Sequence, residues 1–268
     1  MRLVYDRVAE LKTGAAEQTT CQTPGLPCND VIAVHDGSLQ YPASTVPSLE
    51  NSSLDIRRGE AIGLVGPTGS GKSTLLDVLM AILAPTTGSV TVDGIDIQTH
   101  QGAWQKNLGY VPQSVFLIDA SVRENIALGL EPSEVDDDAL HRAVRAAELE
   151  PLLSRLDAGL DTAVGERGVR LSGGECQRIA IARALYNNPD ILMMDEATSA
   201  LDNTTEAAVV AAVEALKGDR TIIMIAHRLS TVRRCDRIVF LKHGRIDAIG
   251  TYNELLTEHA DFRRMAEA

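Results

Sequence analysis

The stretch EAIGLVGPTGSGKSTLLDVLMAIL, residues 60–83, decides the fold. Its first part, EAIGLVG (60–66), predicts a buried strand, and KSTLLDVLMAIL (72–83) predicts a helix. Between them, GPTGSGKST (66–74) fits the pattern G-x-x-x-x-G-K-[ST]. A strand, a glycine-rich loop and a helix in this order predict a phosphate-binding loop, called the P-loop below, in a protein of the α/β class.

The residue types of the P-loop suit ATP. Glycines let backbone N–H groups converge on phosphates, because side chains would block the approach, and the following helix N-terminus adds positive potential. We expect Lys72 to reach the β- and γ-phosphates and Ser73 to bind Mg²⁺ through its hydroxyl. The alternative is a glycine-rich turn with no ligand. The P-loop residues predicted to contact the nucleotide are Gly66, Pro67, Thr68, Gly69, Ser70, Gly71, Lys72, Ser73 and Thr74.

A pair of acids ends the apolar run ILMMDE, residues 191–196. Ligands of open α/β sheets bind at the carboxyl ends of the strands, where these acids lie. Successive side chains of a strand point to opposite sides, so the two carboxylates can serve different purposes. We expect Asp195 to hold Mg²⁺ and Glu196 to polarise the attacking water. The alternative is a strand end with two solvated acids.

Three further side chains are candidates for the same site. His227 ends TIIMIAH, on a strand expected beside the one carrying Glu196, and could donate a hydrogen bond to the γ-phosphate. Gln113 ends GYVPQ and could reach both the metal and the water. Tyr41 could stack on adenine in a chain that is only 3% aromatic. The alternative for His227 is a core histidine, and the alternative for Tyr41 is a tyrosine in a surface loop.

Strand and helix patterns alternate from Val31 onward, which predicts a mostly parallel sheet covered on both faces. Residues 114–188 differ: they have mostly helical periodicity and predict an inserted helical subdomain. In the helix predicted from Asn203, Asn203 and Glu206 have the spacing of a capping box. The remaining elements are predicted as strands at 89–94, 108–113, 191–196, 220–227, 237–244 and 245–250 and a final helix at 252–267.

The N-terminal part and the composition narrow the function classes. Residues 2–12 could form a short amphipathic helix, and residues 13–30 have the composition of a linker. The net charge of −12 disfavours nucleic acid as a partner, because phosphate contacts need a basic surface. The four cysteines show no metal-binding spacing and are interpreted as reduced thiols. No apolar run of about 18 residues is present to cross a membrane.

A second glycine-rich turn, LSGGE at 171–175, also opens a helical stretch. One interpretation is a capping box, in which Ser172 caps the helix and Glu175 reaches back. That interpretation leaves Gly173 and Gly174 unexplained. Two glycines at the positive end of a helix suit the close approach of an anion, so the chain has two candidate phosphate sites.

With these motifs in order, the chain resembles the ATPase domains of ABC transporters. The resemblance rests on GPTGSGKST, Gln113, LSGGE, ILMMDE, SALD (199–202) and His227, and it covers about residues 31–268. It implies a P-loop NTPase core with a mostly parallel sheet, an antiparallel β part and the inserted helical subdomain. It also implies that two subunits, identical or related, sandwich two ATP molecules head to tail. Ser172, Gly173 and Gly174 then bind the ATP held by the P-loop of the other subunit, and Asp202 lies at the dimer seam.

One residue departs from the family pattern. The signature motif most often ends in Gln, whereas this chain has Glu175, which is also included in the predicted nucleotide-binding set. A carboxylate close to a triphosphate is unfavourable unless it points away. In the capping box, the Glu175 carboxylate points back to Ser172 and so away from a triphosphate.

Other segments resemble exporters in particular. They are TAVGERG (162–168), VFLIDASVRENIALG (115–129) and IAHRLSTVRRCDRIVFLKHGRI (225–246). This resemblance implies transmembrane domains as partners, with residues 1–30 as a connection to them, and a location at the cytoplasmic face of the membrane. The alternatives are an ABC ATPase with another mechanical task and a P-loop kinase or simple NTPase switch. The last class has no need of LSGGE, SALD or His227.

Overall fold

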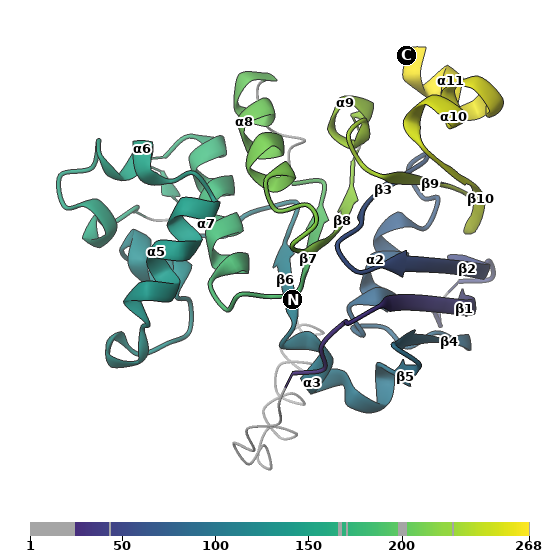
Figure 1. Ribbon diagram of the computed structural model, residues 1–268, viewed down its shortest axis with the longest axis horizontal. Coiled ribbons are helices and arrows are strands. Elements are labelled where there is room, and N and C mark those ends of the chain that lie inside the picture. Colours follow the sequence, from purple (N-terminus) through teal and green to yellow (C-terminus); the bar gives the residue numbers. More distant parts are fainter. Residues whose placement is uncertain are drawn as a thin grey trace.

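The protein is described here from a computed structural model covering residues 25–42, 44–165, 168–169, 171–197, 203–226 and 228–267, without the side chains of residues 203–205 and 208. Two β-sheets and a group of helices form the described part (Figure 1). The predicted helix over residues 2–12 lies outside the described residues.

The larger sheet has six strands in the order β10-β9-β3-β8-β7-β6. All neighbours pair in parallel except β10, which runs antiparallel to β9 at one edge. The prediction of a mostly parallel sheet is therefore confirmed. The strands are β3 (Ala61–Val65), β6 (Leu108–Val111), β7 (Ile191–Asp195), β8 (Thr221–Ile225), β9 (Arg237–Lys242) and β10 (Arg245–Gly250).

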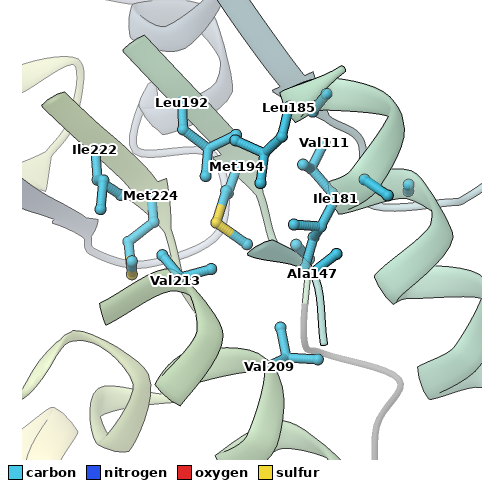
Figure 2. Close-up of a cluster of buried hydrophobic side chains, with 14 of the residues drawn as sticks. Val111, Ala147, Ile181, Leu185, Leu192, Met194, Val209, Val213, Ile222 and Met224 are labelled. Carbon is cyan, nitrogen blue, oxygen red and sulfur yellow. The ribbon is translucent and has the colours of Figure 1, made fainter. Parts of the chain in front are cut away.

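Both faces of this sheet are buried, because side chains alternate along each strand. On β7, Leu192 and Met194 join one hydrophobic cluster, whereas Ile191 and Met193 join the other. Figure 2 shows the first cluster, in which these two side chains and those of β6 and β8 meet residues of helices α7 (Gly173–Leu185) and α8 (Asn203–Glu214). Helix α2 (Lys72–Leu79) belongs to the second cluster, so α2 and α7 cover opposite faces of the sheet.

The smaller sheet is antiparallel, with the strand order β2-β1-β4-β5. The expectation that strands and helices alternate from Val31 onward is wrong here, since β1, β2 and β3 follow one another without a helix in the described residues. Antiparallel strands need no long crossover, and only residues 58–60 separate β2 from β3. The strands are β1 (Val31–Leu39), β2 (Leu49–Arg57), β4 (Thr87–Val92) and β5 (Ile95–Asp96).

Helix α2 (Lys72–Leu79) is shorter than the predicted helix over residues 72–83. Ala81 adopts a left-handed conformation with φ of 55° and donates its N–H to Val78 O, while Ile82 N donates to Asp77 O. This pair of bonds satisfies the terminal carbonyls and stops the helix. The single tryptophan, Trp104, lies in α3 (Gln101–Gln105), is fully buried and donates to Leu79 O at 2.8 Å.

The segment between β6 and β7 is helical, as the sequence predicts. Helix α7 contacts α4, α5 and β6, so it joins these helices to the sheet (Figure 1). The helices are α4 (Val122–Ile126), α5 (Asp137–Ala146), α6 (Glu150–Leu153) and α7 (Gly173–Leu185). Among the described residues, the short 3₁₀ helices are η2 (Gln98–His100), η3 (Pro132–Glu134) and η4 (Gly159–Asp161).

The predicted C-terminal helix over residues 252–267 is two helices, α10 (Tyr252–Glu258) and α11 (Ala260–Glu267). Between them, His259 has an extended backbone, and its Nδ1 accepts the N–H of Phe262 at 3.1 Å. This break lets Phe262 become fully buried beside Phe240. Between β7 and β9 the structure also contains α8 (Asn203–Glu214) and α9 (Leu229–Val232).

The residues just before β1 pack against the domain. Cys28 is 2% exposed and belongs to the core, and the Asp93 carboxylate accepts the backbone N–H groups of Asn29, Asp30 and Val31. Among the residues described, none of the helices has both the length and the apolar character of a membrane span.

Gly63 in β3 lets α9 approach the sheet. A Cβ added at Gly63 would lie 2.6 Å from Val232 Cγ1, whereas one added at Gly102 in α3 would meet nothing within 4 Å. We expect Gly63→Ala to lower the free energy of unfolding by about 1–3 kcal/mol through overpacking. The matched control Gly102→Ala should leave it unchanged or raise it by up to about 1 kcal/mol. Urea denaturation of both variants measures this, and equal stabilities would contradict the packing argument.

Candidate nucleotide-binding site

The P-loop lies between the end of β3 and the start of α2, and its outer glycines leave no room for side chains. Gly66 has φ of 146°, and an added Cβ would lie 2.1 Å from Leu241 O. Gly71 has φ of 103°, and an added Cβ would lie 2.5 Å from Ser48 O. Both ends of the loop thus pack closely against the backbone of other segments of the same chain, at Leu241 and at Ser48.

A cavity of about 220 Å³ lies over the P-loop. Lys72 is buried and donates its ammonium to Gly66 O at 2.9 Å and to Pro67 O at 3.1 Å. Burial lowers the pKa of Lys72, while the nearby charges of Glu196 and Asp195 act in the opposite direction. The cavity is lined by Ser48, Thr68, Gly69, Gly71, Lys72, Ser73, Thr74 and Glu196.

The polar groups at this cavity fit a phosphate group and a hard cation. Ser70 Oγ is buried and has no hydrogen-bond partner within the described part of the chain. Gly69 is open, since an added Cβ would meet nothing within 4 Å. Hydroxyl, carboxylate and amide oxygens are the ligands that Mg²⁺ prefers. Ser73 lines the cavity, and Gln113 contacts Glu196, which also lines it. The charge of Asp195 acts on the Lys72 ammonium, so all three oxygen types occur here.

The two acids end β7 as the sequence predicts, and their backbones differ. Asp195 is the last residue of the strand, whereas Glu196 has φ of 47°, a left-handed conformation that is uncommon for a side-chain-bearing residue. Its N–H donates to Ile225 O of β8 at 3.1 Å. The Glu196 side chain therefore leaves the strand direction and reaches the cavity, and such local strain is typical of functional sites.

Gln113 meets Glu196 because β6 and β7 are parallel neighbours. Both strands end at the same edge of the sheet, and Gln113 Nε2 donates to Glu196 Oε2 at 2.5 Å. The structure thus brings together two residues that lie 83 positions apart in the sequence.

Tyr41 lies beside the first turn of α2. Its hydroxyl is 3.4 Å from Thr74 Oγ1, and the residue is 38% exposed. Stacking of Tyr41 on adenine stays a prediction. His227 and Asp202 lie outside the described residues. The prediction that the strand preceding His227 lies beside the strand carrying Glu196 is confirmed, since β8 pairs with β7 in parallel.

The second glycine-rich turn caps α7. Ser172 Oγ accepts the N–H of Glu175 at 3.3 Å, and Ser172 N donates to Glu175 Oε2 at 2.8 Å, which is the predicted capping box. Ser172 and Gly173 are exposed, and neither they nor Gly174 line the P-loop cavity. Because α7 and α2 cover opposite faces of the sheet (Figure 1), the two turns lie apart and share no pocket among the residues that the structure describes.

Glu175 also forms an ion pair with Arg155, a residue that sequence reasoning did not select. Burial alone would raise the pKa of Glu175, but the hydrogen bonds from Ser172 and Arg155 lower it overall, so the carboxylate is ionised at neutral pH. Arg155 follows α6 and lies 20 positions before Glu175, and no local pattern joins the two residues. Only the fold could reveal this contact.

Comparisons with known proteins agree with this geometry. The family model described as "ABC transporter" matches residues 49–199. The chain is 47% identical over 214 residues to the "Beta-(1-->2)glucan export ATP-binding/permease protein NdvA" of Agrobacterium fabrum, covering 80% of this chain and 36% of the relative. It is 40% identical over 263 residues to the "ATP-dependent lipid A-core flippase" of Thiobacillus denitrificans, covering 98% of this chain and 44% of the relative.

A solved structure shares the fold. It is described as the "Structure of a bacterial Atm1-family ABC exporter with ATP bound", with a TM-score of 0.82 and 35% identity over 97% of this chain and 46% of that one. This chain thus spans less than half the length of these relatives. With the P-loop, the paired acids and the capped glycine turn in place, the chain belongs to the ABC transporter family, as an ATPase domain homologous to those of exporters and flippases.

Proposed function

We propose that this chain binds and hydrolyses ATP to drive an exporter or flippase, and that two such domains close head to tail around two ATP molecules. The observation that carries the proposal is the separation of its two anion-binding turns. The P-loop opens into a cavity on one side, whereas Ser172 and Gly173 of the capped turn are exposed and are not among the described residues that line this cavity. A second subunit brings the two turns together on one nucleotide.

Different residues of the site have different roles in ATP hydrolysis. Lys72 leaves the carbonyls of Gly66 and Pro67 to neutralise the β- and γ-phosphates, and the P-loop amides hold the remaining phosphate oxygens. When bound, Mg²⁺ supplies charge neutralisation between the phosphates. Ser73, Asp195 and Gln113 would hold the ion.

Glu196 accepts a proton from the attacking water, and Gln113 keeps its carboxylate oriented through the 2.5 Å hydrogen bond. The predicted role of His227 is a hydrogen bond to the γ-phosphate, and that of Asp202 is a contact at the seam between subunits. The predicted role of Tyr41 is to stack on the adenine ring.

The partners in this proposal are a second ATPase domain and the transmembrane domains of a transporter, which place the chain at the cytoplasmic face of a membrane. The proposal is supported by relatives whose names describe export and lipid flipping and which are more than twice as long as the part matched here.

Lys72→Ala removes the cation that faces the phosphates. We expect the dissociation constant for ATP to rise about 10- to 100-fold, because a charge-assisted hydrogen bond is lost. Fluorescence titration with a labelled ATP analogue measures this. An unchanged affinity would place the nucleotide elsewhere.

Ser172→Arg places a bulky cation at the capped turn. We expect ATP binding to the single chain to be unchanged, while the hydrolysis rate falls about 100-fold or more because the γ-phosphate loses its donors from the other subunit. Loss of ATP binding by the single chain would put both turns in one site.

Mixing the Ser172→Arg and Lys72→Ala chains is the sharper form of this test. In a head-to-tail pair, the intact P-loop of one chain meets the intact turn of the other, so part of the hydrolysis rate should return. Two inactive chains that stay inactive when mixed would count against contact between subunits.

Glu196→Gln removes the proposed general base but keeps a side chain of the same size. Hydrolysis should fall about 100-fold or more, and the closed pair should accumulate with ATP and Mg²⁺. Size-exclusion chromatography with light scattering should show a monomer without ATP and a dimer with it. A monomer under both conditions would contradict the proposed sandwich.

A further inference from the structure

The carboxylate of Glu175 is held by groups from two parts of the chain. Its Oε2 accepts the Ser172 N–H at 2.8 Å within the capping box, and its Oε1 accepts from the Arg155 guanidinium. The Glu175 side chain is 20% exposed, whereas that of Arg155 is 66% exposed. The carboxylate is therefore largely buried, and its ion-pair partner is the more exposed of the two side chains.

In the first turn of α7, the ion pair compensates a negative charge that would otherwise oppose anion binding. The N-terminus of a helix carries partial positive charge, which makes it attractive to anions. Glu175 places a full negative charge in the same turn, directly after Gly173 and Gly174. Partial burial weakens the screening of that charge by water, so an uncompensated carboxylate would repel an approaching phosphate.

We propose that Arg155 is a positioning residue for nucleotide recognition: it offsets the charge of Glu175 and holds this carboxylate away from the exposed face of the turn, so that α7 can accept the γ-phosphate of ATP bound to another subunit. This inference rests on the proposed function. Arg155 reaches Glu175 from the chain segment after α6, so the ion pair also links that segment to α7.

The capping box and the ion pair have separable roles. Glutamine at position 175 keeps the geometry of a capping box, because its side-chain oxygen can still accept the Ser172 N–H. It removes the charge, and with it the need for a compensating arginine. We therefore expect Arg155 to affect ATP-dependent dimer formation when residue 175 is Glu and not when it is Gln.

The experiment uses the Glu196→Gln chain as parent and measures the ATP concentration at half-maximal dimer formation by light scattering. Arg155→Ala should raise this concentration about threefold to tenfold, as expected for an unbalanced charge near a phosphate at a partly exposed site. The dissociation constant for a labelled ATP analogue on the monomer should stay the same, because the P-loop is untouched. Arg142→Ala, which removes an exposed arginine of α5, is the matched control and should not change dimer formation.

The same Arg155→Ala change is then made in the Glu175→Gln background. There its effect should disappear, and Arg155→Lys with Glu175 present should retain most of the dimer formation of the parent. Thermal unfolding of each variant monitors the fold. An effect of the same size in both backgrounds shows that Arg155 acts only on folding or packing, and overturns the inference.

Dimer formation by the parent chain and by its Arg155→Ala variant distinguishes a failure of this inference from a failure of the proposed function. If the parent chain stays monomeric with ATP, the sandwich itself is refuted and the inference falls with it. If the parent forms a dimer and Arg155→Ala leaves the required ATP concentration unchanged, the sandwich stands and the role of Arg155 is refuted.

Discussion

The alternation of side chains along the parallel strands is the constraint on which the rest of the structure depends. Strands such as β7 and β8 bury residues on both faces, so helices must cover both faces of the sheet. Helix α2 covers one face and α7 the other, as seen in Figure 1. Each of these helices begins at a glycine-rich turn, and the sheet between them keeps the two turns apart.

Parallel pairing also assembles the residues proposed for hydrolysis. When strands run in the same direction, the segments that follow them gather at one edge of the sheet. The P-loop follows β3, Glu196 follows β7 and Gln113 follows β6. The left-handed backbone of Glu196 then turns its side chain from the strand direction toward the cavity beside Lys72. A single topological rule thus positions a cation, a carboxylate and an amide that are far apart in the sequence.

Electrostatics at the two helix N-termini differ. The P-loop presents Lys72, and no acid lies in the first turn of α2. In contrast, α7 carries Glu175 in its first turn, and this charge is satisfied by a capping hydrogen bond and by Arg155. The departure from the usual signature residue is therefore accommodated locally: the acid is held by partners within the chain rather than left to face a phosphate.

The sequence by itself determined the P-loop, the acids at the end of β7, the helical insertion and the capping box at Ser172. These features are local, because a glycine spacing, an apolar run or a cap depends on residues close in the chain. The sequence did not show that β1 to β3 are consecutive strands, that α2 stops at Leu79, or that the C-terminal helix breaks at His259. Only the tertiary structure decided these points, together with the contacts of Gln113 with Glu196 and of Arg155 with Glu175. The physical reason is that each depends on which distant segments pack together, and such packing can override local propensity and leaves no periodic trace in the sequence.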